Sequence, residues 1–266
     1  MDSLYIIKIG GNIIDDETRL NRFLQSFADL PGKKILVHGG GKLATRLAEQ
    51  MGITQQLVDG RRITDADTLR VVTMVYAGQV NKNIVASLQS KNCNAFGLTG
   101  ADGNSIQAHK RIHPTLDYGF VGDVDQVNSS LVEQLLKLGL SLVFAPITHN
   151  GGGQLLNTNA DTIAQELARG LSASFDVQLI YSFEKPGVLL DANDDSSLIP
   201  RIGPAYYKQL REEKRIFEGM IPKMDNAFAA LNSGVSKVII GNAEELEALV
   251  SGNSGTTITT QNEWSS

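Results

Sequence analysis

Two lysines and one aspartate in this 266-residue chain have types and positions suited to moving a phosphoryl group. Lys8 lies near the end of an apolar run over residues 4–9, where a buried ammonium is costly without a partner. Lys223 stands at the start of a predicted helix, and Asp161 opens another. Phosphoryl transfer spreads negative charge over the transferred group, and fixed cations stabilise that charge. An aspartate between the two lysines would hold both in place and keep them charged.

Other interpretations of these side chains are open at this point. A single lysine at a strand end usually reaches solvent, and Asp161 could serve only as a helix cap. His38 precedes three glycines and is expected to be packed and hydrogen-bonded close to the site. His109 and His113 have no Cys or acidic partner at metal-ligand spacing, so we expect no zinc site there.

Glycine-bearing turns follow four of the predicted strands. They are K-I-G-G-N at residues 8–12, H-G-G-G at 38–41, G-L-T-G-A-D-G at 97–103, and the loop that leads into N-T-N-A-D at 157–161. Ligands of an open parallel sheet bind at the carboxyl ends of its strands, where glycine lets backbone N–H groups approach anionic oxygens. Each turn alone could be a simple tight turn, but four at one edge predict an anion site. None fits G-x-G-x-x-G or G-x-x-x-x-G-K-[ST], so neither a Rossmann dinucleotide site nor a P-loop is supported.

Short apolar runs alternate with amphipathic segments along the whole chain. Strands are predicted at residues 4–9, 33–37, 95–99, 141–147, 176–183, 235–241 and 256–260, with a hairpin of 104–110 and 122–127. Helices are predicted at residues 17–30, 66–91, 130–138, 161–171, 224–233 and 243–250, with another from the 38–41 turn to residue 51. This alternation predicts an α/β fold, a three-layer αβα sandwich around one mostly parallel sheet.

Composition limits the cellular setting and the partners. The formal net charge is −5, with 42% apolar and 20% charged residues, as in ordinary globular domains. Acidity argues against nucleic acid as a partner, so an anionic substrate must be bound by a few placed cations. Cys93 is the single cysteine, and no run reaches the 18 or so apolar residues of a membrane span. We therefore expect a cytoplasmic protein without a membrane or nucleic-acid partner.

The motifs taken together, with G-R-R-I-T at residues 60–64 and G-M-I-P-K-M at 219–224, resemble the amino-acid kinase superfamily. Within it the chain is similar to the N-acetylglutamate kinase family, from residue 4 to about residue 260. The resemblance implies the amino-acid kinase fold and ATP-dependent phosphorylation of the γ-carboxylate of N-acetyl-L-glutamate in arginine biosynthesis, with Mg²⁺ bound to the nucleotide. Because that carboxylate is already ionised at neutral pH, no general base is required.

The resemblance also implies roles for individual residues. The catalytic residues would be Lys8, Lys223 and Asp161; the substrate-binding residues Gly40, Gly41, Arg62 and Asn157; and the cofactor-binding residues Gly10, Gly11, Ser182 and Gly187, with no metal ligand from the protein. Residues 1–173 would form the acyl-glutamate-binding and dimerisation lobe, and residues 174–266 the ATP-binding lobe. A homodimer with its seam on the helix at residues 66–91 is implied, without arginine inhibition, because arginine-sensitive members carry an extra N-terminal helix.

The chain departs from the family pattern in three places. The usual S-D-V-x-G-V reads S-F-E-K-P-G-V at residues 182–188, the loop at 149–154 differs, and Ala101 replaces a common lysine beside the expected acyl site. These changes leave the acyl group open between acetyl and another group such as succinyl. A succinyl group adds a carboxylate, which predicts an extra cation or a wider pocket. A non-catalytic binding or regulatory protein on the same fold is the alternative from another class, against which the retained Lys8, Asp161 and Lys223 argue.

Overall fold

The computed structural model describes residues 1–58, 61–216 and 220–260. In this part of the chain eight strands form a central sheet in the order β12-β14-β13-β11-β1-β2-β8-β5. They are β1 (Ser3–Ile9), β2 (Lys33–Val37), β5 (Ala95–Leu98), β8 (Ser141–Phe144), β11 (Asp176–Phe183), β12 (Arg201–Ile202), β13 (Lys237–Asn242) and β14 (Thr256–Ile258). Neighbouring strands are parallel except for the β13–β14 pair, which is antiparallel. The predicted mostly parallel sheet is confirmed.

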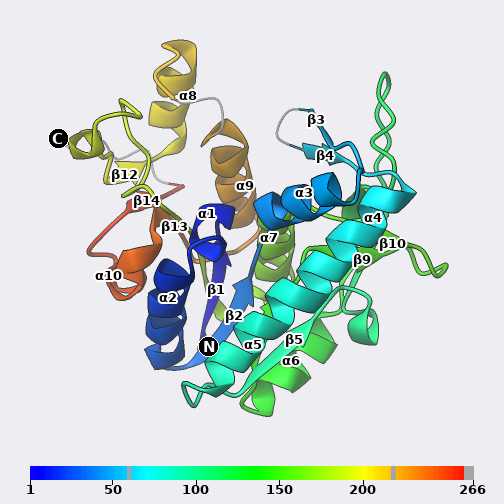
Figure 1. Cartoon of the computed structure of the whole chain (residues 1–266). Coiled ribbons are helices and arrows are strands. Elements are labelled where there is room, and N and C mark those ends of the chain that lie inside the picture. Colours follow the sequence, from blue (N-terminus) through cyan, green and yellow to red (C-terminus); the bar gives the residue numbers. More distant parts are fainter. Residues whose placement is uncertain (59–60, 217–219, 261–266) are drawn as a thin grey trace.

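Helices cover both faces of this sheet, as the three-layer prediction requires (Figure 1). One face is covered by α6 (Ser129–Lys137), α7 (Ala160–Leu171), α8 (Pro204–Glu212) and α9 (Ile221–Asn232). The other is covered by α2 (Glu17–Asp29), α3 (Gly41–Gln50), α4 (Ala66–Thr73), α5 (Asn81–Gln89) and α10 (Leu246–Ser251). A short helix, α1 (Gly11–Ile14), directly follows β1, and 3₁₀ turns lie at Asp102–Asn104, Asp195–Ser197 and Ala243–Glu245.

Alternation along β1 decides which helices its lysine meets. Leu4 and Ile6 are fully buried in the core under α7 and α9, whereas Ile7 and Ile9 are fully buried in the opposite core. Successive side chains of a strand point to opposite faces, so Lys8 shares the face of Leu4 and Ile6. The strand is apolar on both faces because both are covered, which is typical of parallel sheets.

One long rod crosses the near side of the sheet in Figure 1. It consists of α4, a π-helical turn η1 (Met74–Val80) and α5, so it spans residues 66–89 of the predicted helix at 66–91. The π turn was not predicted. It lies where Tyr76 and Val80 approach Gly40, within 3.0 to 3.3 Å of the position that a Cβ on this glycine would take. Wide turns of this kind are frequent beside functional sites.

Two smaller sheets lie beyond the carboxyl ends of the central strands. A four-stranded sheet has the order β10-β9-β6-β7, and β3 pairs with β4. The strands are β3 (Gln56–Val58), β4 (Arg61–Ile63), β6 (Ile106–Lys110), β7 (Gly122–Val127), β9 (Ile147–His149) and β10 (Leu155–Asn157). The predicted hairpin of residues 104–110 and 122–127 is confirmed, because β6 and β7 pair antiparallel.

The prediction of one strand over residues 141–147 is wrong. The central sheet keeps only β8, which ends at Phe144, and β9 begins at Ile147 in the four-stranded sheet. Pro146 lies between them and has no N–H to donate to a ladder, so the chain leaves one sheet there and enters another. The glycine-rich segment that follows is the turn of a β9–β10 hairpin.

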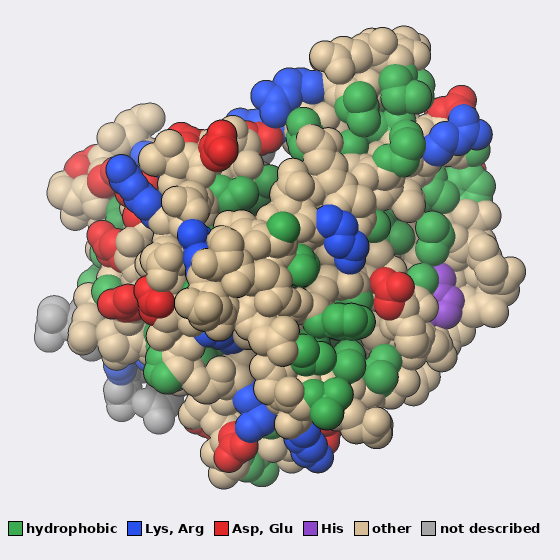
Figure 2. Space-filling view, turned by 60° about the horizontal axis from the view of Figure 1, so that its bottom comes forward, with side chains coloured by type: hydrophobic (Ala, Val, Ile, Leu, Met, Phe, Trp, Pro, Cys, Tyr) green, Lys and Arg blue, Asp and Glu red, His purple; other side chains and the backbone are tan. Residues whose placement is uncertain are grey.

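The face seen in Figure 2 carries acidic and basic side chains side by side, with hydrophobic side chains gathered in small groups. None of the described helices is both long enough and apolar enough to cross a bilayer. The strands before residue 173 make up one side of the central sheet and those after it the other, and they meet where β1 pairs with β11.

Candidate active site

The three residues proposed for phosphoryl transfer meet in space. Lys8 Nζ on β1 lies 2.7 Å from Oδ1 of Asp161, and Lys223 Nζ on α9 donates to Oδ2 of the same carboxylate over 2.9 Å. Asp161 belongs to the first turn of α7, so three segments far apart in sequence converge here. The side chains of Lys8, Asp161 and Lys223 are 13%, 14% and 23% exposed. Lys8 therefore does not extend into solvent as a typical strand-end lysine would.

The triad sets the charge of each member. Burial on its own would raise the pKa of Asp161, but the ammonium groups of Lys8 and Lys223 hold it below its usual value. Burial lowers the pKa of Lys8; the Asp161 carboxylate counteracts this, and the Lys223 ammonium adds to the lowering. The carboxylate thus stays ionised and keeps two cations together, although they repel one another.

Asp161 is not the cap of its helix. The N-cap is Asn159, whose side-chain oxygen accepts hydrogen bonds from the backbone N–H groups of Asp161 and Thr162. The capping alternative for Asp161 is therefore wrong, and its carboxylate is free to bind the lysines. Its place in the first helical turn also favours a negative charge, because the helix dipole is positive there.

A cavity of about 190 Å³ lies on one side of the triad. Its wall includes Asn159, Ala160 and Thr162, which flank Asp161, together with the predicted substrate residues Gly40, Gly41, Arg62 and Asn157. This volume is below the roughly 300–1,000 Å³ of pockets for drug-sized ligands, so it suits a small metabolite.

The glycine loop and Arg62 form one wall of this cavity. Gly40 has φ of +145°, and a Cβ there would lie 3.0 Å from the Tyr76 ring, so the position requires glycine twice over. Gly41 opens α3. The Arg62 guanidinium donates to Gly41 O over 3.0 Å and to Thr45 Oγ1 over 2.8 Å. These bonds present a charged fork beside the loop, a geometry suited to a carboxylate.

Asn157 stands at the end of β10, next to this fork. Its Nδ2 donates to Thr64 Oγ1 over 3.0 Å, and its backbone pairs with Val121. The four predicted substrate residues are thus brought together on one cavity wall. The motif around Arg62 was predicted to begin at Gly60, which lies outside the described residues.

A second cavity, of about 360 Å³, borders the triad at Lys223. Lys223 and the predicted cofactor residue Gly187 line it, with an apolar wall that includes Phe183, Val188, Leu189 and Met220. Glu184 on this wall accepts a hydrogen bond from Asn12 Nδ2 over 2.5 Å, which ties α1 to the end of β11. The position is suited to a nucleotide with a base between apolar side chains and phosphates near Lys223.

The other predicted cofactor residues anchor the strands beside this cavity. Gly10 N donates to Ser182 O over 3.0 Å, and Ser182 Oγ donates to Lys8 O over 3.1 Å. The Ser182 side chain is buried and therefore fixes β1 to β11. A Cβ on Gly11 would meet no atom within 4 Å, so its backbone lies open. The structure brings Gly187 and Lys223 together on the cavity wall and places Ser182 behind it.

A buried histidine is hydrogen-bonded to the glycine loop. His38 Nδ1 donates to Gly39 O over 2.7 Å, and Asn81 Nδ2 donates to His38 Nε2 over 3.1 Å. Asn81 also donates to Val143 O, and its own oxygen accepts from Lys82 Nζ, which fixes the amide orientation. Burial lowers the pKa of His38 to about 4, so the ring is neutral at physiological pH. The prediction of a packed, hydrogen-bonded His38 is confirmed.

Several residues of the two cavities were not predicted. Tyr76, Arg111 and Val121 line the smaller cavity, and Glu184 and Met220 the larger one. Glu184 and Met220 lie inside the motifs at residues 182–188 and 219–224, so these motifs could have indicated them as site residues. Tyr76 lies in the long helix and Arg111 at the end of a hairpin strand, where nothing in the sequence separates them from structural residues.

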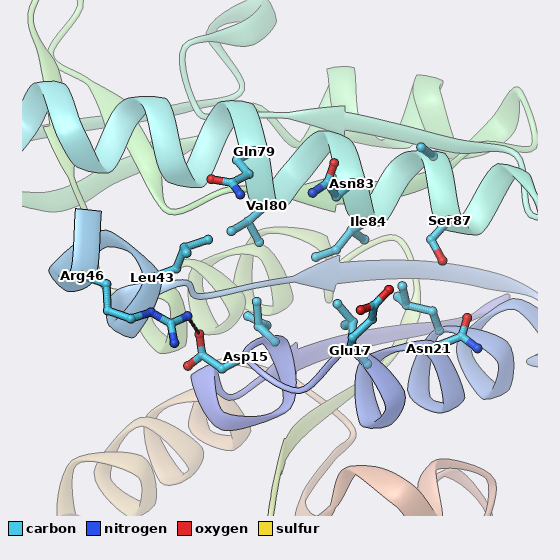
Figure 3. Close-up of a pocket in the computed structure, with 14 residues that line it drawn as sticks. Asp15, Glu17, Asn21, Leu43, Arg46, Gln79, Val80, Asn83, Ile84 and Ser87 are labelled. Carbon is cyan, nitrogen blue, oxygen red and sulfur yellow. Dashed lines mark hydrogen bonds and ion pairs between the residues drawn. The ribbon is translucent and has the colours of Figure 1, made fainter. Parts of the chain in front are cut away.

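A wider hollow of about 580 Å³ lies between α2, α3 and the rod (Figure 3). Arg46 and Asp15 face one another at one end, with 3.3 Å between Arg46 Nη2 and Asp15 Oδ1, while Val80 and Ile84 point into the space from the rod. None of the predicted site residues lines it. The two smaller cavities are the candidates for ligand binding, because residues that flank Asp161 line one and Lys223 lines the other.

Comparison with known proteins agrees with this arrangement. The sequence model of the amino acid kinase family matches residues 3–242, and the chain belongs to this family. Acetylglutamate kinase of Bacteroides fragilis is 56% identical over 239 residues, which cover 90% of this chain and 92% of that protein. Acetylglutamate kinase of Cytophaga hutchinsonii is 55% identical over 254 residues, covering 95% and 96%. The predicted family is confirmed, and the chain is a kinase.

Solved structures agree with the fold. N-acetylglutamate synthase from Neisseria gonorrhoeae, complexed with coenzyme A and N-acetyl-glutamate, superposes with a TM-score of 0.83 at 21% identity. The match covers 98% of this chain and 60% of that one. At this identity the likeness shows the fold alone, and the predicted amino-acid kinase fold is confirmed.

Proposed function

We propose that this enzyme transfers the γ-phosphoryl group of ATP to the γ-carboxylate of N-acetyl-L-glutamate, a step of arginine biosynthesis. The acetylglutamate kinases at 55–56% identity support the substrate. The observation that carries the proposal is the Asp161 triad beside two cavities: residues that flank Asp161 line the smaller one, and Lys223 lines the larger, more apolar one. A phosphoryl group passing from one cavity to the other would pass the two ammonium groups.

The reaction requires placement and positive charge more than acid–base chemistry. A carboxylate oxygen attacks the γ-phosphorus, an O–P bond forms, and the bond from that phosphorus to the bridging oxygen of ADP breaks. The products are an acyl-phosphate and ADP. Lys8 would stabilise the transferred group from the substrate side and Lys223 from the nucleotide side, with Asp161 positioning both.

The small cavity would bind the acceptor at both of its carboxylates. The amides of Gly40 and Gly41 would bind the acylated amino acid, and Arg62 with Asn157 would hold the α-carboxylate. The Arg62 guanidinium is suited to this role because its described hydrogen-bond partners are neutral oxygens, which leave its positive charge uncompensated. The γ-carboxylate would then point toward Lys8.

We propose that ATP occupies the larger cavity as its Mg²⁺ complex, with Gly10 and Gly11 near the phosphates and Ser182 and Gly187 in the region of the adenine. Mg²⁺ usually keeps several waters and binds substrate phosphates with one or two carboxylates. The cavity fits this, since Glu184 supplies a carboxylate on the wall that Lys223 shares. When bound, the ion would neutralise phosphate charge.

The assembly and compartment are proposed on separate grounds. Residues 1–173 would bind the acyl-glutamate and residues 174–266 the ATP, since the two cavities draw mainly on these halves. Cys93 is a free, buried thiol, which is compatible with the reducing cytoplasm. A homodimer is proposed along the rod and β5: β5 ends the described sheet order, and its Phe96 is 44% exposed.

A coupled ADP-release assay with N-acetyl-L-glutamate tests the proposal. Lys8→Arg should lower kcat by at least about 10²-fold, because the longer, planar guanidinium carries its charge away from the position of the Lys8 ammonium, 2.7 Å from Asp161. Lys33→Arg is the matched control: Lys33 also forms a 2.7 Å ion pair, with Asp2, at the amino end of the sheet. Wild-type turnover no higher than background, with folding intact, would refute the function and favour a non-catalytic binding protein.

A further inference from the structure

The hydrogen bonds of the buried His38 ring allow only one arrangement of its protons. A carbonyl oxygen can only accept, so Nδ1, 2.7 Å from Gly39 O, carries a proton and donates it. The neutral ring has no second proton, so Nε2 accepts from Asn81 Nδ2 over 3.1 Å. His38 is 0% and Asn81 1% exposed, so water does not compete for these bonds. The ring is therefore held as the tautomer with its proton on Nδ1.

The amide of Asn81 is itself fixed in orientation. Its Nδ2 also donates to Val143 O over 2.9 Å, and its Oδ1 accepts from Lys82 Nζ over 3.0 Å. The same ammonium donates to Gly97 O over 2.9 Å. Turning the amide over would place its oxygen against a carbonyl and its NH₂ group against an ammonium. Asn81 therefore presents a donor, and not an acceptor, to the His38 ring.

Gly97 leaves the space that this amide occupies. It opens the G-L-T-G-A-D-G motif and pairs with Val143 in the central sheet. A Cβ at Gly97 would lie 2.1 Å from Asn81 Oδ1 and 2.7 Å from Val85 Cγ2. Any larger residue would push the amide out of its place under the ring. This glycine thus serves the support of the loop at residues 38–41 and not a ligand directly.

Holding the Gly39 carbonyl also sets the direction of the next N–H group. The carbonyl of Gly39 and the N–H of Gly40 belong to one planar trans peptide, in which the two groups point in opposite directions. Since Gly39 O points to the buried ring, the Gly40 N–H points away from it. Gly40 lines the smaller cavity, and its N–H has no hydrogen-bond partner in the part of the chain that the structure describes.

We propose that His38 is a positioning residue, which aims the Gly40 N–H at the substrate by holding the Gly39 carbonyl, and that Asn81 fixes the ring tautomer on which this depends. The inference rests on the proposed function, in which this amide binds the acylated amino acid. A peptide held in its binding orientation beforehand does not have to be ordered when the substrate arrives, which favours binding.

The tautomer can be tested without any turnover. In NMR spectra of the ¹⁵N-labelled full-length enzyme, the ring signals that disappear in His38→Asn belong to His38. They should show a protonated Nδ1 and an unprotonated Nε2 at neutral pH. Asn81→Asp replaces the donor at Nε2 by an acceptor, so Nε2 should become protonated in that variant. A proton on Nε2 in the wild type, or an unprotonated Nε2 in Asn81→Asp, would overturn the assigned support.

Steady-state kinetics test the positioning itself. His38→Leu removes the donor to Gly39 O, so KM for N-acetyl-L-glutamate should rise by roughly 10- to 100-fold, as on loss of a hydrogen bond to a charged group. KM for MgATP should change by less than about threefold, because that nucleotide does not bind at this loop. In His38→Asn the amide nitrogen is attached to Cγ, as Nδ1 is, and can still donate to Gly39 O. This variant should recover most of the loss.

His149→Leu is the matched control. The Nδ1 atom of His149 accepts from Gly151 N–H over 3.2 Å in another glycine turn, which does not line the smaller cavity. Both KM values should therefore stay at the wild-type level in this variant.

The outcomes separate this inference from the function on which it rests. Equal KM values for N-acetyl-L-glutamate in His38→Leu and His38→Asn would overturn the role of the donor. A parallel rise of both KM values in His38→Leu would also overturn it, because His38 would then act on the fold as a whole. Either result would leave the kinase function standing. Absence of wild-type turnover of N-acetyl-L-glutamate would remove the proposed function and the inference with it.

Discussion

Replacing Asp161 by asparagine tests the central feature of the site, a single carboxylate that holds two ammonium groups. The ion pairs measure 2.7 and 2.9 Å, and at an effective dielectric constant near 20 each is worth about 6 kcal/mol before desolvation. Desolvation of the three buried charges offsets most of this. Removing one partner of a buried pair typically costs about 3–5 kcal/mol. We expect a loss near the lower end, about 3 kcal/mol, because asparagine keeps an oxygen that one lysine can still contact.

The loss of activity should be larger than the loss of stability suggests. Without the carboxylate, Lys8 and Lys223 repel one another, and the pKa of Lys8 falls further because Asp161 is the main group that raises it. We expect kcat to fall by roughly 10²–10³-fold, as on removal of one electrostatic contact to a transition state. As the pH is raised, the remaining activity should begin to decline at a lower pH than in the wild type. Lys8 then loses its proton earlier, and a neutral Lys8 no longer stabilises the transferred group.

The measurements are urea unfolding and the ADP-release rate, at several pH values between 6 and 10. Glu244→Gln is the matched control: it removes a carboxylate that forms a 2.7 Å ion pair with Arg19 on the surface, where the group is 39% exposed. Such exposed pairs are worth about 0–1 kcal/mol, so stability and rate should hardly change. A kcat for Asp161→Asn within about threefold of the wild type, in a folded protein, would refute the role assigned to the triad.

The remaining predictions concern acid stability and assembly. The pKa of His38 is about 4 in the folded protein and 6.5 for the free side chain. Between these two values the unfolded chain binds more protons than the folded one. The free energy of unfolding therefore falls as the pH falls, by up to about 3 kcal/mol. His38→Asn should remove this slope in urea titrations at pH 4 to 7, and an unchanged slope would show that another group is responsible. In sedimentation the wild type should be a dimer and Phe96→Asp a monomer, because Phe96 is the exposed apolar side chain of edge strand β5; a hexamer would contradict the proposed seam.

Sequence patterns were most reliable where a segment is buried on both faces. The bounds of β2 and β11 match the predicted runs at residues 33–37 and 176–183, because every position between neighbouring strands and two helix layers favours apolar residues. The strand predictions that were wrong or missing are those where something other than burial on both faces determines the structure. Pro146 divides an apolar run between two sheets, and β3, β4 and β10 are three-residue strands with too few positions to show a period.

The same distinction applies to the site. Lys8, Asp161 and Lys223 could be predicted because they occupy motifs at strand ends and helix starts, where the fold itself brings ligands. The place of Arg111 on the cavity wall could not, since it depends on the pairing with Asp123, twelve residues away across a hairpin. From the sequence, an extra cation is expected beside the acyl site only if the acyl group is charged. Which residue would supply it is decided by tertiary packing.

The distribution of charge explains how a protein with net charge −5 can bind two anions. In the described part of the chain the triad carries two positive charges and one negative, so it keeps one net positive charge for the transferred group. Among the described residues Arg62 donates to neutral oxygens, so its charge would remain for a carboxylate. Arg111 is neutralised by Asp123 and offers N–H groups rather than net charge. Truncating Arg62 should therefore weaken binding of every N-acyl-glutamate.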